Sequence, residues 1–371
     1  MLKTSTLTRI AASALVASVA FAPTAFAANK PAPKPVTKTP AKPVAKPVAK
    51  PVAKPAGPCV IVTPAPSFQT IKIAGTQINT TAAVLAADKA NCFAKYGIKL
   101  AWTDAFPAPG VALTALAGGS IEVTYAPTVP IINFVVNAGL KAKILAPGDG
   151  YAPGQQAKIL DGGTSKMTDD TAVLVKTGGA IKSWADLEGK SVAVPARKAQ
   201  LEVTIAAKVR EDGGDPAKVK FLALGMPEMA AAIKKGDIDA GGVVEPFGTA
   251  GVADGLSLLG FPAAGFFNDG GAVGVWLATE AWTSANRDLA LAFQKAMSES
   301  NAWASAPANL SKVRAEIPKI TGVTAAEAAA SNIPFLPTAP VSASDVSSVA
   351  SKMNFMGYIS KRVDAAALLF R

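Results

Sequence analysis

Residues 183–211, SWADLEGKSVAVPARKAQLEVTIAAKVRE, decide the class of fold. This stretch predicts a short helix at 183–187, a strand at 191–194 and a longer helix at 200–211. Helices that alternate with short apolar strands are typical of α/β proteins.

The alternation extends in both directions from this stretch. Upstream, a strand at 70–75 precedes a helix at 82–96, which Asn79, Thr80 and Thr81 can cap and which Gly97 ends. Further predicted strands lie at 98–102, 121–125, 141–145, 171–176, 218–222, 238–243 and 256–259, and further helices at 110–117, 129–137 and 227–234. Strands separated by helices predict parallel sheets covered on both faces. A return strand at 272–278 and a mostly helical C-terminus complete the pattern.

Two similar halves are indicated by a weak internal repeat. Gly119-Ser120-Ile121-Glu122 leads to Pro127, and Gly236-Asp237-Ile238-Asp239 leads to Pro246. Because ligands of open α/β sheets bind beyond the carboxyl ends of the strands, the loops at Pro127 and Pro246 are expected pocket walls. The Gly-, Asp- and Thr-rich stretch 148–170 between the halves is the expected hinge.

The N-terminus has the pattern of a cleaved secretory signal peptide, residues 1–27. Lys3 and Arg9 precede an uncharged apolar run at 10–21, and the small-residue triplet Ala25-Phe26-Ala27 follows. The run is far shorter than the roughly 20 residues that a spanning helix needs. We expect a protein secreted to the periplasm or another extracytoplasmic face.

Residues 28–58 form a predicted Lys/Pro/Ala-rich linker. Lysine recurs every fourth residue from Lys30 to Lys54, and nine prolines favour an extended polyproline conformation. Removing these seven lysines and the two signal-peptide cations from 37 basic residues leaves 28, against 26 acidic ones. The nearly neutral remainder gives no reason to expect nucleic acid binding.

Cysteine and histidine usage restricts the chemistry. Cys59 and Cys92 are the only cysteines, and in an oxidising compartment we expect them to form a disulfide. The chain has no histidine, the commonest general base and transition-metal ligand. The fragments that resemble a phosphate-binding loop at 189–191 and a nucleophile elbow at 255–260 have the wrong spacing. We expect no enzyme, no cofactor and no metal, with a carboxylate-based enzyme as a minor alternative.

Residues 183–195, SWADLEGKSVAVP, resemble a motif of periplasmic substrate-binding proteins of ABC importers, in the nitrate, sulfonate and taurine group. Further fragments agree in order and spacing over residues 69–368: the segment 87–98, the two turns of the internal repeat, Glu245-Pro246, and Met356-Gly357-Tyr358-Ile359, which matches the group's C-terminal helix. The resemblance implies a two-lobed type II periplasmic-binding-protein-like α/β fold, each lobe a sheet flanked by helices, joined by two crossing segments.

The resemblance also implies boundaries and partners. Lobe one would comprise 69–150 and the returning segment 272–371, and lobe two would comprise 170–267. A monomer would close on a small-molecule ligand by hinge motion and deliver it to a membrane permease. The expected ligand is a small anion or zwitterion of the sulfonate, taurine or nitrate type.

Seven residues are the candidate ligand contacts. Helix starts favour an anion, and Arg197, where the group contacts ligand, can grip a sulfonate in a bidentate manner. Glu245 suits an amine on the ligand, with pairing to Arg197 as its alternative role, and Tyr151 can stack on a planar ligand. The full set is Gln77, Asn79, Thr80, Thr128, Tyr151, Arg197 and Glu245.

Two alternative functions remain open at the level of sequence. The same fold binds pyrimidine or aromatic compounds in related proteins, and Phe106 and Phe247 are further candidates for stacking. The Lys/Pro linker is also compatible with a stalked surface protein that binds wall polymer or another interaction partner.

Overall fold

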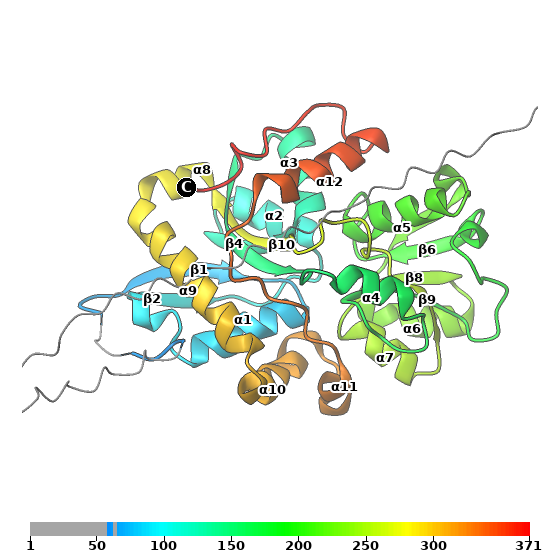
Figure 1. Ribbon diagram of the computed structural model, residues 1–371, viewed down its shortest axis with the longest axis horizontal. Helices are drawn as coiled ribbons and strands as arrows, with labels where there is room; N and C mark the ends of the chain where they lie inside the picture. Colours follow the sequence, from blue (N-terminus) through cyan, green and yellow to red (C-terminus); the bar gives the residue numbers. More distant parts are fainter. Residues whose placement is uncertain (1–57, 62–64) are drawn as a thin grey trace, which may run out of the picture. The chain divides into compact units, whose positions relative to one another are not determined.

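The structure, a computed structural model, describes residues 58–61 and 65–371. The predicted signal peptide and nearly all of the predicted linker lie outside the described residues. Pro55–Arg371 forms one compact unit. Within it the described chain folds into two five-stranded sheets, each flanked by helices (Figure 1).

The first sheet has the order β2-β1-β3-β10-β4. β1 pairs in parallel with β2 and β3, whereas β10 runs antiparallel to β3 and β4. Its strands are β1 (Gln69–Ala74), β2 (Ile98–Trp102), β3 (Val123–Pro127), β4 (Ala142–Gly150) and β10 (Ala272–Thr279). We call this sheet, with helices α1–α3 and α8–α12, the first lobe.

The second sheet has the order β7-β6-β8-β5-β9. β6 is parallel to β7 and β8, and β5 is antiparallel to β8 and β9. Its strands are β5 (Thr171–Val175), β6 (Ser191–Val194), β7 (Lys220–Ala223), β8 (Ala240–Val244) and β9 (Ser257–Gly260). We call this sheet, with helices α5–α7, the second lobe. The prediction of parallel sheets is therefore wrong for β5 and β10, the strands that follow each crossing between the lobes.

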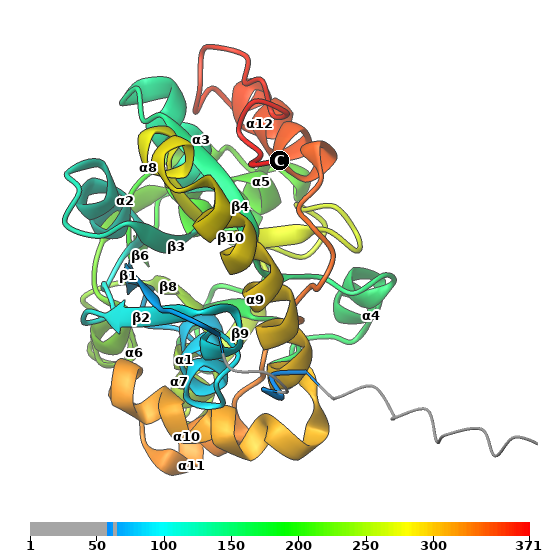
Figure 2. The same ribbon diagram turned by 90° about the vertical axis from the view of Figure 1, so that its left-hand side faces the viewer.

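The predicted helix bounds are correct to within one residue at each end for Pro109–Ala117, Thr128–Asn137, Gln200–Glu211 and Met226–Lys235, whereas no helix is predicted at Gln155–Asp161 or Phe247–Ala253. The described residues contain twelve α-helices. They are α1 (Asn79–Lys89), α2 (Pro109–Ala117), α3 (Thr128–Asn137), α4 (Gln155–Asp161), α5 (Gln200–Glu211), α6 (Met226–Lys235), α7 (Phe247–Ala253), α8 (Glu280–Ala285), α9 (Arg287–Ser305), α10 (Leu310–Thr321), α11 (Ala325–Ala330) and α12 (Ala343–Phe355). Figure 2 shows α10 and α11 on the side of the first lobe that α1 covers, and Glu316 of α10 pairs with Lys89 of α1 at 2.7 Å.

Three predictions about helices are corrected. The helix predicted at 82–96 ends at Lys89, because Asn91 adopts a left-handed φ of 66°. Asn79, Thr80 and Thr81 lie inside the first turn of α1 and do not cap it; the N-cap is Ile78. Residues 356–359 follow α12, which ends at Phe355, and are not part of the C-terminal helix.

The two segments that cross between the lobes are hydrogen-bonded to each other. The first carries α4, and the second runs from β9 to β10 (Figure 1). Gln156 of α4 donates to the Phe267 carbonyl at 3.2 Å and accepts from the Gly265 N–H at 2.7 Å. The predicted hinge at 148–170 therefore contains the end of β4 and a helix, and it is bonded to the other crossing segment.

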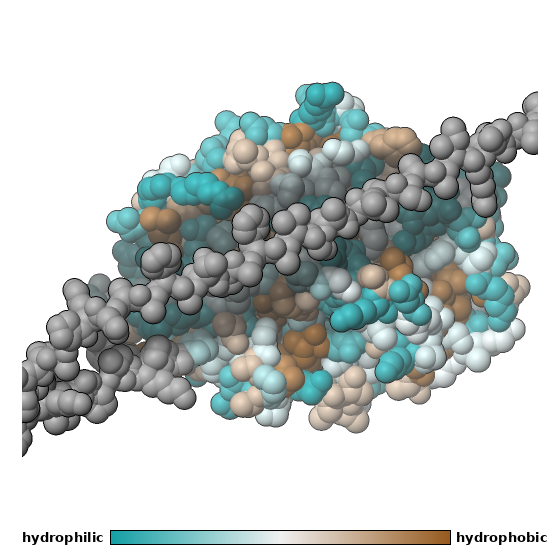
Figure 3. All heavy atoms as spheres, viewed as in Figure 1, coloured by the Kyte–Doolittle hydropathy of each residue, from teal (hydrophilic) through white to brown (hydrophobic). Residues whose placement is uncertain are grey.

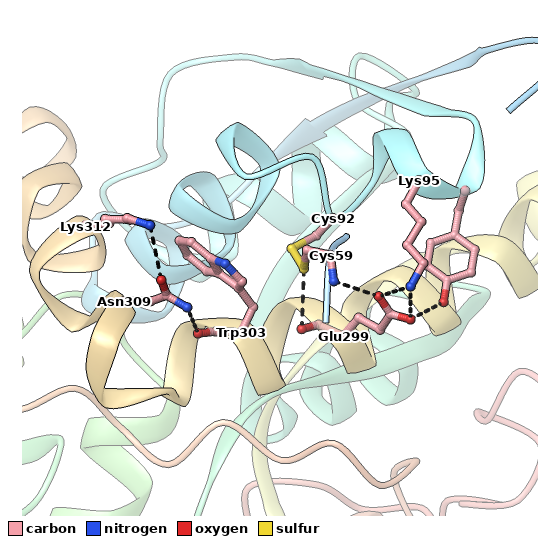
Figure 4. The surroundings of a disulfide bond; sticks show 8 residues. Cys59, Cys92, Lys95, Glu299, Trp303, Asn309 and Lys312 are labelled. Atoms are coloured by element: carbon pink, nitrogen blue, oxygen red, sulfur yellow. Dashed lines mark hydrogen bonds and ion pairs between the residues drawn. A yellow bond between two sulfur atoms is a disulfide. The ribbon is translucent and has the colours of Figure 1, made fainter. Parts of the chain in front are cut away.

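A disulfide joins Cys59 and Cys92, whose Cα atoms lie 4.2 Å apart (Figure 4). Glu299 of α9 lies beside it and accepts hydrogen bonds from the Cys59 N–H at 3.0 Å and the Tyr96 hydroxyl at 2.6 Å. It also pairs with Lys95 at 2.7 Å. These contacts fasten the start of the first lobe to its longest helix.

Hydrophobic and hydrophilic residues are mixed on the face shown in Figure 3. A membrane-spanning helix is not found among the described residues, since no helix there combines enough length with enough apolar character.

Candidate functional site

A narrow cavity of about 50 Å³ lies between the two lobes and is lined by both. The first lobe contributes Thr76, Ile78, Pro107, Pro109, Tyr125, Pro127, Asp149 and Val273. The second lobe and the crossing before it contribute Asp170, Pro195, Ala199, Gln200, Leu201, Met226 and Val244. Ligand pockets usually measure about 300–1,000 Å³. A ligand of more than a few heavy atoms would therefore require the lobes to separate.

Helix starts surround this cavity, and their N-caps have no polar side chain. Ile78, Ala108, Pro127, Ala199 and Gly225 are the N-caps of α1, α2, α3, α5 and α6, and none caps its helix with a side chain. Each of these N-caps or its neighbour lines the cavity. Elsewhere, α8, α11 and α12 have Thr or Ser N-caps that accept a bond from the first turn, whereas α4, α7, α9 and α10 also lack a side-chain cap.

Uncapped helix starts offer their first-turn N–H groups to another acceptor. The N–H groups and the helix dipole together favour a negatively charged group. The five helix starts therefore direct N–H donors toward a cavity whose lining contains no Lys or Arg.

Asp149, near the end of β4, supplies the first of two carboxyl groups in the cavity lining. Its Oδ1 accepts from the Gly274 N–H at 2.9 Å, and its Oδ2 accepts from the hydroxyls of Thr80 at 2.5 Å and Tyr125 at 2.6 Å. Burial nevertheless raises the pKa of Asp149. A side chain at Gly274 would collide with Tyr125, so glycine is required for this close packing.

Asp170 supplies the second carboxyl, and its side chain has no hydrogen-bond partner among the described residues. Its Oδ1 atom is shielded from solvent and unpartnered. Burial, followed by the nearby charges of Asp149, Asp169 and Glu245, raises the pKa of Asp170 well above its usual range. A carboxylate with a shielded, unpaired oxygen is costly, so this group will bind either a proton or a hydrogen-bond donor.

The antiparallel strand β5 explains how Asp170 reaches the cavity. Thr171 of β5 lies opposite Val244 at the carboxyl end of β8, and the Glu245 N–H donates to the Asp170 carbonyl at 2.8 Å. The residue that precedes β5 therefore lies at the same sheet edge as the residues that follow β8.

None of the seven predicted ligand contacts is among the residues that line this cavity. Four of them are sequence neighbours of lining residues, since Thr76, Ile78, Pro127 and Val244 line it. The four predicted residues are Gln77, Asn79, Thr128 and Glu245. Gln77 is partly exposed, and Thr128 is buried with an unpartnered hydroxyl. Ligand contact by these residues stays a prediction.

Most of the predicted side chains have protein partners. Asn79 donates to the Ser331 hydroxyl and the Asn332 carbonyl, at 3.1 and 2.6 Å, while Thr80 donates to Asp149. The Tyr151 hydroxyl donates to Asp169 at 3.0 Å and its side chain is buried, while its contact with a ligand stays a prediction.

Arg197 and Glu245 do not pair with each other, so that alternative is wrong. Arg197 pairs with Glu202 at 2.6 Å and donates to the Phe221 carbonyl. Glu245 is fully buried and accepts from Thr249, through its N–H at 2.9 Å and its hydroxyl at 2.7 Å, and from the Asn332 N–H at 3.0 Å. The last bond joins the second lobe to the segment that follows α11.

The prediction missed Asp149, Asp170, Tyr125 and Gln200. A signal for the first two was present, because both aspartates lie in the stretch identified as the hinge. The rule that ligands lie beyond the carboxyl ends of strands predicts pocket walls at Pro127, which lines the cavity, and at Pro246, which does not. It does not find Asp170, which precedes a strand. No group of three or more acidic, His or Cys side chains suited to a metal ion occurs in residues 58–61 and 65–371.

Comparison with known proteins gives the family and the fold. Residues 65–317 match the family model described as the NMT1-like family. The structure resembles the alkanesulfonate-binding protein SsuA from Xanthomonas axonopodis pv. citri bound to MOPS, with a TM-score of 0.66 and 19% identity, over 83% of this chain and 100% of that one.

Two further structures show the range of functions on this fold. The periplasmic nitrate-binding protein NrtA from Synechocystis PCC 6803 has a TM-score of 0.61 and 14% identity, over 82% of this chain and 86% of that one. The desulfurization enzyme DSZB has a TM-score of 0.54 and 12% identity, over 81% of this chain and 96% of that one. The comparison with curated proteins found no match. The two-lobed periplasmic-binding-protein fold expected from the sequence is thus confirmed.

Proposed function

The chain belongs to the NMT1-like family, and from this we propose that it is the solute-binding component of an ABC importer. In this role the exported protein captures a small solute between its lobes and delivers it to a membrane permease. The observation that supports the proposal best is the cavity lined by both lobes, because closing or opening the lobes would grip or release its contents.

The proposed solute carries an acidic group of the sulfonate type. Five helices begin at the cavity without a side-chain cap, and their first-turn N–H groups suit such a group. The cavity lining has no Lys or Arg, and Arg197 is already paired with Glu202. The anion would therefore be bound by backbone N–H groups and hydroxyls.

Binding without turnover is part of the proposal. Three of the four carboxyl groups in this region, those of Asp149, Asp169 and Glu245, already accept hydrogen bonds from the protein. With no histidine in the chain, a general base would have to be found among these groups or Asp170. Recovery of every bound compound unchanged after prolonged incubation is the expected result, and a converted product would indicate an enzyme.

Thermal unfolding in the presence of candidate solutes tests the function directly. The panel comprises taurine, isethionate, longer alkanesulfonates, nitrate and 4-aminopyrimidine. A ligand at about 100 times its dissociation constant adds roughly 2.7 kcal/mol to the stability of the folded state. Stabilisation by at least one small solute supports the proposal. No stabilisation by any of them, together with binding to isolated wall polymer, would favour the stalked surface protein instead.

A further inference from the structure

Asp170 and Gln200 both line the cavity, and each has a side-chain oxygen without a hydrogen-bond partner in the described part of the chain. Asp170 has a shielded, unpartnered Oδ1 atom, as described above. Gln200, the first residue of α5, is only 7% exposed, and its Oε1 atom has no partner in the described part of the chain. Both atoms are hydrogen-bond acceptors, so both call for a donor.

The charges around Asp170 make a donor with positive charge the best match. The negative charges of Asp149, Asp169 and Glu245 all disfavour a negative charge on Asp170. No Lys or Arg lines the cavity, so no protein cation there offsets Asp170. Asp149 differs from Asp170 because three protein donors already bind it.

We propose that the solute carries an ammonium or amino group that donates to Asp170 and Gln200 when its acidic group occupies the helix starts. The ligand class is thus a compact zwitterion or an amino-substituted acid or heterocycle, and Asp170 selects it against a simple anion. This inference rests on the proposed function, because it names the ligand of the same cavity.

An alternative use of Asp170 gives the opposite selectivity. A protonated Asp170 carboxyl could itself donate a hydrogen bond to an anion, and it would then bind nitrate or a hydroxysulfonate without any amino group. Asparagine at position 170 retains an N–H donor but cannot accept a salt bridge. The substitution Asp170→Asn therefore separates the two possibilities.

The experiment is isothermal titration calorimetry on the mature chain with compounds matched in shape. Taurine, β-alanine and 4-aminopyrimidine are compared with isethionate, 3-hydroxypropionate and 4-hydroxypyrimidine, in which a hydroxyl group replaces the amino group. We expect at least one amino compound to bind at least tenfold more tightly than its hydroxyl partner. The Asp170→Asn substitution should then reduce that affinity at least tenfold and remove most of the selectivity.

Asp104→Asn is the matched control, because it makes the same aspartate-to-asparagine change at an exposed position that does not line the cavity. We expect its affinity to stay within about twofold of the parent's. Binding of isethionate or nitrate as tightly as any amino compound, unchanged by Asp170→Asn, would overturn this inference and leave the proposed function standing. If no compound of either series binds, both are rejected.

Discussion

Asp149 and Asp170 line the same cavity but differ in their surroundings. Asp149 has three protein donors, which stabilise its charge even though it is buried. The side chain of Asp170 receives no hydrogen bond from the described residues, and it lies near other carboxyl groups. Proteins tolerate such a destabilised group where it serves binding, so a substitution there is expected to affect stability and affinity in opposite directions.

The free energy of unfolding of the ligand-free protein provides one prediction at this scale. Folding raises the pKa of Asp170 well above the ordinary 3.8, so the folded state holds this proton more tightly than the unfolded state. Its contribution to stability is therefore present below pH 3.8 and is lost as the pH rises toward the folded pKa. Asp170→Asn should match the parent near pH 4 and be more stable at pH 7, by on the order of 1–3 kcal/mol.

Urea denaturation at the two pH values measures this difference, and the pH 4 pair serves as the internal control. Asp169, whose pKa burial raises to about 6, contributes with the same sign between about pH 3.8 and 6 in both proteins. Equal stability of parent and variant at pH 7 would show that Asp170 has a partner under solution conditions.

Glu245 leads to a different prediction, because its carboxylate accepts three hydrogen bonds. The NH2 group of a glutamine cannot accept a hydrogen bond, so Glu245→Gln leaves at least one of these buried donors unpaired. We expect a loss of about 1–3 kcal/mol in stability without ligand. Glu228→Gln, on the exposed surface of α6, is the control and should lose less, because a carboxylate in the first turn of a helix is worth about 0.3–1 kcal/mol. Equal stability of both variants would mean that the three bonds contribute little.

Within the second lobe, the elements themselves could be predicted well from sequence, and their directions could not. The strand at 191–194 and the helix at 200–211 have the predicted bounds, because apolar spacing and the turns around them are local properties. The antiparallel direction of β5 depends on its pairing with β8. The paired residues Thr171 and Val244 are about 70 positions apart in the sequence. The site prediction failed at Asp170 for the same reason.

The N-caps at the cavity give a prediction about α5. Replacing its N-cap by a residue with a hydroxyl, Ala199→Ser, should satisfy a first-turn N–H group and stabilise the helix by about 0.5–2 kcal/mol. The same hydroxyl would compete with the ligand's acidic group, so the affinity for taurine should fall. Thermal unfolding and calorimetry measure the two effects on one protein.

Thr324→Ala is the matched control at the N-cap of α11, where Thr324 and Glu327 form a capping box. This variant should lose about as much stability as Ala199→Ser gains and keep its affinity for taurine. Unchanged or higher affinity in Ala199→Ser would contradict a role for the α5 start in binding the anion.

At the scale of the whole molecule, the lobes are joined by contacts outside the cavity. Asn133 of α3 donates to the Lys198 carbonyl at 3.1 Å, and the guanidinium of Arg210 in α5 lies 5.3 Å from the ring of Phe355 at the end of α12. These contacts involve both lobes and would break if the lobes separated. They are therefore candidates for stabilising the closed form.

Phe355→Ala tests this role, because Phe355 is 76% exposed and contributes little to the core. A cation–π contact at an exposed site is worth about 0.5–1 kcal/mol. Its loss should weaken ligand binding by roughly two- to fivefold and leave the stability of the ligand-free protein nearly unchanged. Phe68→Ala removes another exposed phenylalanine that precedes β1 and should change neither quantity. If the two variants bind the ligand with equal affinity, the contact between Arg210 and Phe355 does not stabilise the closed form.

The central claim is that two lobes enclose the solute, and small-angle X-ray scattering of Pro55–Arg371 tests it most directly. Scattering would be recorded with and without a solute whose binding calorimetry has established. We predict that saturation with this solute decreases the radius of gyration, and that Asp170→Asn at the same concentration of an amino-group ligand shows less of the decrease. A bound solute that leaves the radius of gyration of the parent protein unchanged would contradict capture by closure of the lobes.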